Sequence, residues 1–154
     1  MQGRLSPKPV DRIQAFPKDH WREEFSHAQQ LGFDCIELIY DELYLEQNPL
    51  QSAQGREEIC VLSKRHQIEV SSICADYFMP HPLERNLELA VVLLDIAKAV
   101  NCPLVEFPFV HSSSLRSHKN KNELIEAIMV LSKTAKIKDI KIALETDLPP
   151  DDFK

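Results

Sequence analysis

The sequence has little glycine. Gly3, Gly32 and Gly55 are the three glycines among 154 residues. A phosphate-binding loop of the Rossmann or P-loop type needs several closely spaced glycines, because the backbone must approach the phosphate without side chains in the way. The composition therefore excludes both kinds of nucleotide-binding loop.

Long apolar runs are also missing. The longest apolar region, 87–100, is interrupted by Glu88, Asp95 and Lys98. It falls short of the roughly eighteen apolar residues that a membrane-spanning helix requires. The N-terminus has no apolar signal core, so we expect a cytoplasmic protein without membrane partners.

Excess positive charge is absent, and the cysteines show no metal-binding spacing. The formal net charge is −6, which gives little general attraction for nucleic acid or an anionic membrane. Cys35, Cys60, Cys74 and Cys102 form no C-x-x-C pair and lie within or beside apolar runs. We expect buried, reduced thiols rather than a zinc site or a disulfide framework.

Short apolar runs of strand length recur along the chain at a steady period. They lie at 35–39, 68–73, 104–109 and 142–144, with starts 33, 36 and 38 residues apart, and a further short run opens the chain at 1–5. Each interval carries a helical pattern, so the predicted order is β-α-β-α-β-α-β-α-β.

Two of the expected helices have clear end signals. Trp21, Phe25 and Ala28 fall on one helix face, and Gly32 suits the left-handed position after the helix. Asn120, with a glutamate three residues later, resembles a capping box and predicts the start of another helix.

Alternating strands and helices imply a parallel sheet with right-handed crossovers. An open doubly wound sheet and a segment of a closed (β/α)₈ barrel both satisfy this pattern. Periodicity alone does not choose between them.

Polar residues recur where the predicted strands end: Gln2, Arg4, Glu37, Asp41, Asp76, Glu106, His111, Glu145 and Asp147. Because parallel strands end at one edge, we expect these groups to converge on a polar pocket. Carboxylates with a histidine suit a divalent metal, and they also suit binding of sugar hydroxyls or proton transfer.

Several of these residues also have a structural interpretation. Arg4 could pair with a neighbouring carboxylate, and Asp76 could fix a turn. His111 could be a loop residue. Glu37 projects opposite to its apolar neighbours, as does Glu106. For Glu145 we favour a functional role, because an acid at the end of an apolar strand is costly to bury without a partner.

Five segments together resemble the xylose-isomerase-like TIM-barrel proteins, the sugar phosphate isomerase/epimerase group. They are residues 1–7, 13–17 with Trp21 and Phe25, 31–34 before Ile36-Glu37, 71–78 and 144–150. They follow the order of the family and extend over essentially the whole chain.

The resemblance implies a (β/α)₈ barrel with a divalent metal (Mn, Mg, Co or Zn) at its C-terminal face. Glu145 matches the glutamate that ends the fifth strand, a metal ligand and often the proton-transferring base. The substrate would be a sugar or sugar phosphate that reacts through an enediolate. Its binding would involve the other strand-end groups: Gln2, Arg4, Glu37, Asp76, Glu106 and His111.

The resemblance also implies that part of the barrel is missing. A complete barrel needs about 250 residues. We therefore expect residues 1–154 to form one partial domain of five strands and four helices, truncated after strand five. The remaining ligands would belong to strands six to eight, so this polypeptide alone is expected to be inactive. Its first and last strands would be open edges that favour self-association.

Two other functions fit the same pattern. A DNA-repair endonuclease of this superfamily would have basic grooves and several strand-end histidines around zinc, whereas this chain is acidic and has His111 as its one strand-end candidate. A non-catalytic α/β module would use Glu145 structurally. We expect a small-molecule sugar partner and no nucleic acid.

Overall fold

The sheet has four parallel strands in sequential order. A computed structural model describes residues 2–7 and 15–152. Within them the strands are β1 (Cys35–Ile39), β2 (Glu69–Cys74), β3 (Leu104–Phe109) and β4 (Lys141–Thr146), ordered β1-β2-β3-β4. A doubly wound sheet reverses its strand order at a switch point, whereas a barrel runs on in one direction. The topology is that of a partial (β/α)₈ barrel, as expected.

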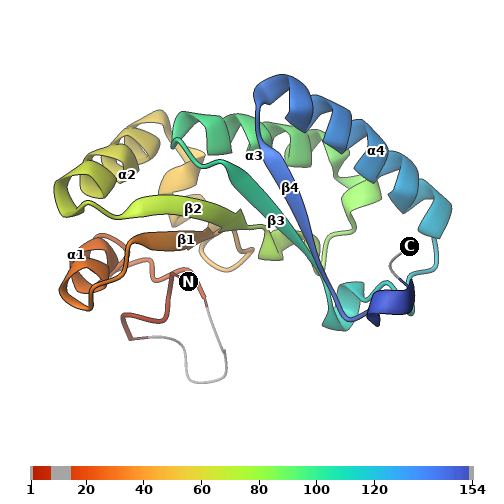
Figure 1. Cartoon of the computed structure of the whole chain (residues 1–154), viewed down its shortest axis with the longest axis horizontal. Coiled ribbons are helices and arrows are strands. Elements are labelled where there is room, and N and C mark those ends of the chain that lie inside the picture. The colour runs from red at the N-terminus through yellow and green to blue at the C-terminus, as the bar shows by residue number, and fades with distance from the viewer. Residues whose placement is uncertain (1, 8–14, 153–154) are drawn as a thin grey trace.

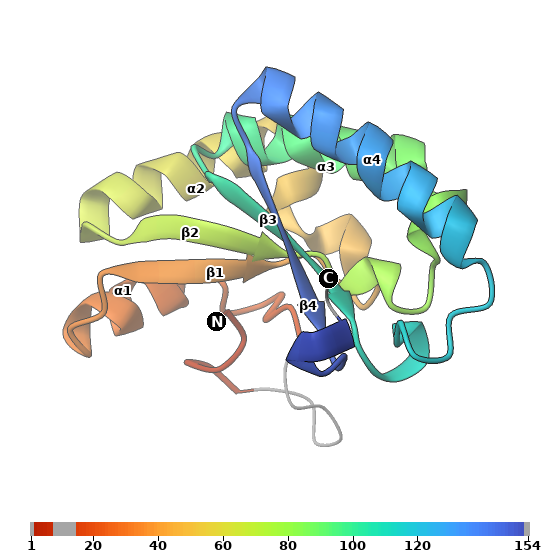
Figure 2. The same ribbon diagram turned by 45° about the vertical axis from the view of Figure 1, so that its right-hand side comes forward.

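One α-helix precedes each strand. The helices are α1 (Glu23–Gln30), α2 (Ala53–His66), α3 (Leu87–Ala99) and α4 (Lys121–Lys138). Figure 1 shows α2, α3 and α4 covering one face of the sheet, and Figure 2 confirms that the N-terminal segment lies on the other side. No helix in residues 2–7 and 15–152 combines the length and apolar character that crossing a membrane requires.

The core lies between the sheet and this layer of helices. Ile73 and Val105 are neighbours in register on β2 and β3, and both are fully buried, as are Phe107 and Leu93. The ring of Phe107 packs against Phe78, with 5.3 Å between the ring centroids. Since side chains alternate along a strand, the burial of these residues directs the polar ones between them to the opposite face.

The N-terminal segment does not form the expected first strand. Among the described residues, 2–5 are turns and bends, and Met1 lies outside the described residues. The Gln2 N–H nevertheless donates to the Glu37 carbonyl at 2.8 Å, and the Ile39 N–H donates to Gln2 Oε1 at 3.1 Å. Gln2 therefore covers part of the outer edge of β1 without a strand. The expected self-association through the ends of the sheet stays a prediction.

A buried carboxylate holds this segment in place. Glu24 of α1 is fully buried and accepts hydrogen bonds from the Gly3 N–H (2.9 and 2.8 Å), the Leu5 N–H (3.1 Å) and Ser6 Oγ (2.6 Å). Gly3 has φ +80°, and a Cβ at this position would lie 2.1 Å from the Ala15 carbonyl oxygen. The approach of the backbone to Ala15 therefore requires glycine.

Of the two predicted helix-end signals, the one at Gly32 is confirmed and the one at Asn120 is not. Gly32 has φ +77° and follows α1, with the Phe33 N–H bonded to the Ala28 carbonyl at 3.0 Å and the Gly32 N–H to the Gln29 carbonyl at 3.1 Å. This is the Schellman arrangement that the sequence predicts. Asn120 directly precedes α4, but its side chain makes no capping hydrogen bond. The capping-box prediction is therefore wrong, although the helix begins where it was expected.

The cysteine prediction also holds in part. All four thiols are free, and Cys74 and Cys102 are buried as expected. Cys35 is exposed at the start of β1. Cys60 is half-buried on α2, where its thiol lies 3.6 Å from the Ala99 carbonyl oxygen.

We predict that Glu24→Gln lowers the free energy of unfolding by about 1–3 kcal/mol, because an amide replaces a charged acceptor of buried N–H groups. Denaturant titration of the full chain measures the change. The adjacent Glu23→Gln is the control, since Glu23 is exposed and its loss should cost less than about 0.5 kcal/mol. Equal effects of the two substitutions would contradict the anchoring role of Glu24.

Candidate active site

Three glutamates lie on the sheet face opposite the helices. Residues paired in register in a parallel sheet project to the same side, and every second residue along a strand does so again. Glu37 pairs with Ser72, and Glu106 pairs with Cys74 on one side and with Ala143 on the other. Glu145 follows Ala143 by two residues. The three strand glutamates named by the sequence therefore share one face.

Glu37 and Glu106 are in contact at the centre of this face. Both are half-buried, and Ser72 Oγ donates a 2.6 Å hydrogen bond to Glu37 Oε2. Burial, together with the charge and hydrogen bonding of Glu37 and the charges of Glu145 and Asp76, raises the pKa of Glu106 to about 7. The carboxyl of Glu106 thus retains a proton up to neutral pH, which lets it share a hydrogen bond with Glu37.

Asp76 lies just past the end of β2, buried, at the start of a short 3₁₀ turn (Asp76–Phe78). It accepts a hydrogen bond of 3.1 Å from the Cys74 thiol. Burial and the neighbouring Asp76 raise the pKa of Cys74 far above its usual range. Cys74 is therefore a neutral donor rather than a thiolate nucleophile. The charge of Asp76 also acts on Glu106.

Glu145 is exposed at the end of β4, so the cost of burying an acid does not apply to it in the described residues. Its charge still acts on Glu106. Asp147, two residues later, accepts hydrogen bonds from Ser114 Oγ at 3.0 and 2.8 Å. This contact ties the loop after β3 to the loop after β4 and leaves Glu145 as the accessible carboxylate of the strand end.

The remaining predicted site residues have other contacts or surroundings. The Gln2 amide oxygen bonds to the backbone of β1, and Arg4 is exposed in the N-terminal segment. Asp41 is buried after β1 and accepts from the Leu43 N–H at 3.3 Å. His111 is exposed in the loop after β3 with φ +50°. Their roles in substrate binding stay predictions.

The carboxylates do not enclose a metal by themselves. In residues 2–7 and 15–152, no group of three or more histidine, cysteine, aspartate or glutamate side chains has the arrangement to hold a metal ion. The donor chemistry does suit one, since crowded carboxylates that raise the pKa of Glu106 are stabilised by a nearby cation. A metal ligand role for Glu145 therefore needs further ligands from outside this part of the chain.

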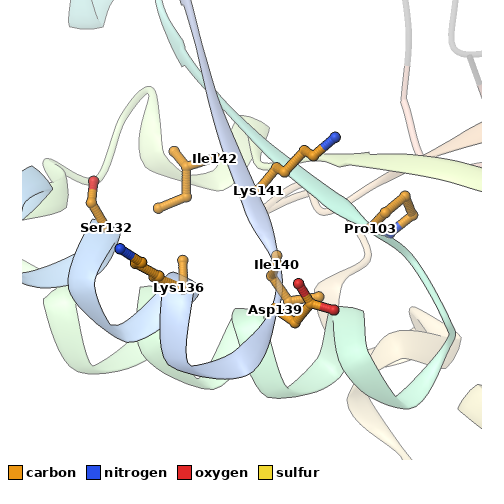
Figure 3. A pocket seen from close by; sticks show the side chains of 8 residues that line it. Pro103, Ser132, Lys136, Asp139, Ile140, Lys141 and Ile142 are labelled. Carbon is orange, nitrogen blue, oxygen red and sulfur yellow. The ribbon is translucent and has the colours of Figure 1, made fainter.

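A cavity of about 570 Å³ lies elsewhere, between α4 and the start of β4. Pro103, Ser132, Lys136, Ile140 and Lys141 are among its lining residues, as Figure 3 shows. Pro103 and Lys141 mark the beginnings of β3 and β4, at the opposite ends of the strands from Glu106 and Glu145. Because parallel α/β folds bind substrates at the carboxyl ends of their strands, this cavity is not the candidate site.

Two residues of the cluster escaped the sequence analysis. Ser72 orients Glu37, and Cys74 bonds to Asp76. A signal existed: both stand at alternate positions of an apolar strand, on the side that its large apolar residues avoid. The strand register needed to connect them to Glu37 and Glu106 comes from the structure.

Removing the charge of Glu37 should weaken the binding of the proton to Glu106, while burial, the largest cause of the raised pKa, remains. We predict that Glu37→Gln lowers the pKa of Glu106 from about 7 toward its usual value of 4.5. Carboxyl ¹³C chemical shifts followed through a pH titration measure this directly. Glu69→Gln, an exposed glutamate at the far end of β2, is the control and should leave the titration of Glu106 unchanged.

The raised pKa of Glu106 also predicts a pH dependence of stability. The folded state binds this proton more tightly than the unfolded state, so its stabilisation is complete below about pH 4.5 and is lost as the pH rises to about 7. We expect Glu106→Gln to remove this loss. As the pH rises from 5 to 8, the free energy of unfolding should then fall less for the variant than for the unmodified chain. Denaturant midpoints across that range test it, and parallel curves would contradict it.

Comparisons with known proteins agree with this architecture. The family model described as xylose isomerase-like TIM barrel matches residues 25–152. The crystal structure of a xylose isomerase domain protein from Planctomyces limnophilus superposes with a TM-score of 0.62 at 15% identity, over 94% of this chain and 52% of that one. The chain thus spans about half the length of this neighbour, and at such low identity the likeness concerns the fold. No curated protein matches. The extent of the family match shows that the chain belongs to the xylose isomerase-like TIM-barrel family.

Proposed function

We propose that this chain supplies part of the active site of a sugar, or sugar phosphate, isomerase or epimerase that depends on a divalent metal. The observation that carries the proposal is the carboxylate cluster at the strand ends, where Glu106 keeps a proton near neutral pH beside Glu37, Glu145 and Asp76. A protonated and an ionised carboxyl on one accessible face are the groups that proton transfer at a sugar carbon needs.

The chemistry follows from these protonation states. In the proposed reaction, Glu145 acts as the base and removes a proton from the carbon next to the substrate carbonyl. This leaves an enediolate. Glu106, still protonated, donates a hydrogen bond to the substrate oxygen on which negative charge develops. Glu106 then gives its proton to that oxygen and takes the proton of the neighbouring hydroxyl, whose oxygen becomes the new carbonyl oxygen. Return of the proton from Glu145 to the former carbonyl carbon completes an isomerisation and restores both carboxyl groups. Epimerisation would need a second acid on the other face of the substrate.

Glu145 is also the residue that we assign to metal binding. A divalent ion (Mn²⁺, Mg²⁺, Co²⁺ or Zn²⁺), when bound, would supply Lewis-acid polarisation of adjacent carbonyl and hydroxyl oxygens of the sugar. Since the described residues include no complete ligand group, the other ligands would lie outside them. The proposal therefore assigns to the 154-residue polypeptide a weak metal site and no turnover by itself.

The acidic character of the chain favours a sugar over nucleic acid as the substrate. The formal net charge is −6, and acidic side chains crowd the candidate site. Binding to DNA gains most of its affinity from basic residues that contact phosphates. A DNA-binding measurement at low salt is a direct check, and salt-dependent affinity would favour the repair-endonuclease alternative.

We predict that Glu145→Gln weakens Mn²⁺ binding by about tenfold or more, because a neutral amide replaces a carboxylate ligand. Electron paramagnetic resonance of free Mn²⁺ titrated with the protein measures the affinity. Glu69→Gln makes the same change of charge at the opposite ends of the strands and serves as the control. Equal affinities of the two variants would show that Glu145 is no ligand.

The same samples test the expected lack of turnover. Incubation of the polypeptide with Mn²⁺ and ketoses or ketose phosphates should give no aldose and no epimer. Robust turnover that Glu145→Gln abolishes would refute the statement on inactivity and support the proposed chemistry. Turnover that survives Glu145→Gln would refute the assigned base.

A further inference from the structure

Helix α4 carries an unusual amount of exposed apolar surface. Of the eight large apolar side chains that are exposed in the described residues, four lie on this helix: Ile125, Met129, Val130 and Ile137. Ile137 is the most exposed of them, at 86%. The helix has 18 residues and is about 27 Å long. Figures 1 and 2 place it at the end of the helical layer, where no further helix of the described chain covers it.

Charged residues of opposite sign flank this apolar surface. Glu123 and Glu126 lie in the first half of α4, and Lys133 and Lys136 lie in the second half. All four are exposed, and none of them forms a salt bridge with another residue of the described part. Acids near the start of a helix and bases near its end suit the helix dipole. The dipole does not explain why exposed apolar residues lie between them.

We propose that a second copy of this chain packs against α4, with the two helices antiparallel about a twofold axis that passes between Met129 and Val130. In an antiparallel pair, residues equally distant from the axis on its two sides lie opposite each other. Glu126 would then face the partner's Lys133. Glu123 would likewise face the partner's Lys136. Both pairs have the same midpoint, so one alignment of the helices satisfies both.

Twofold symmetry makes each of these contacts occur twice. Four ion pairs would surround a centre formed by Met129 and Val130 of both copies. Self-complementarity of this kind identifies the occupant as a second copy of the chain, because the same helix offers both halves of every pair. One helix from each copy forms a small interface compared with the 20–30 residues a side of a stable complex, so the dimer should be weak and concentration-dependent.

The neighbouring edges of the sheet are consistent with this choice. The edge of β1 is partly covered by Gln2, whereas the groove between α4 and β4 is open and includes Lys136 in its lining. The open groove therefore lies beside α4, whereas part of the β1 edge is covered. The proposal concerns a surface away from the carboxylate cluster and does not depend on the proposed function.

Two single charge reversals test the alignment. In a Glu126→Lys dimer, lysine would face lysine twice, and in a Lys133→Glu dimer, glutamate would face glutamate twice. We expect each variant to dimerise about tenfold more weakly than the unmodified chain. An equal mixture of the two variants should recover the dimer, because every pair in the mixed dimer again joins opposite charges. Sedimentation velocity over a range of concentrations measures all three samples.

Matched controls separate this pairing from effects of net charge. Glu57→Lys and Lys64→Glu make the same changes at exposed positions of α2, seven residues apart as Glu126 and Lys133 are. They should leave self-association unchanged, alone or mixed. Far-ultraviolet circular dichroism establishes that every variant keeps its helices.

Three results would overturn the proposal. The first is an unmodified chain that stays monomeric at all concentrations. The second is a dimer that both single variants retain at full strength, since another surface such as the β4 edge would then mediate it. The third is a mixture of the variants that associates no better than either one alone.

Discussion

Crowding of negative charge on one face of a parallel sheet is the constraint on which the candidate site depends. Helices α2, α3 and α4 need an apolar surface, and Val105 and Phe107 supply it on the central strand β3. Alternation then sends Glu106 to the other face. There, register sets it between Cys74, two residues after the partner of Glu37, and Ala143, two residues before Glu145. Partial burial, and then repulsion by Glu37, raise the pKa of Glu106 to about 7. The packing of the core and the acid–base character of the site are consequences of the same alternation.

The sequence predicts this arrangement as far as local pattern reaches. Apolar runs at a steady spacing identify β1 to β4, and the acids between their apolar residues identify Glu37, Glu106 and Glu145 as a shared face. The local sequence pattern does not predict the conformation of a segment, or the exposure of a side chain, that depends on groups distant in the sequence. The pattern of residues 2–5 predicts a strand. Instead, Glu24, about twenty residues away, accepts hydrogen bonds from the N–H groups of Gly3 and Leu5 and from the neighbouring Ser6 hydroxyl, and the segment forms turns. The exposure of Glu145 likewise depends on what covers β4, which its own strand sequence does not encode.

The two edges of the sheet differ in how much of their backbone is covered. At β1, Gln2 uses its backbone and its side chain to satisfy groups that a neighbouring strand would otherwise bond, and Glu24 fixes the segment that carries Gln2. At β4, the strand has an open side next to the groove under α4. An uncovered edge and uncovered apolar side chains at the same end of the domain both favour association there.

Association through α4 would leave the candidate site accessible. The helices and the carboxylate cluster lie on opposite faces of the sheet, so a partner on the outer side of α4 does not obstruct Glu37, Glu106 or Glu145. Nor would it complete the site, since an antiparallel partner brings its own strand ends to a different part of the assembly. The completion of the proposed metal site and the covering of α4 are therefore separate questions in this chain. Dimerisation through α4 should therefore leave the affinity for Mn²⁺ unchanged.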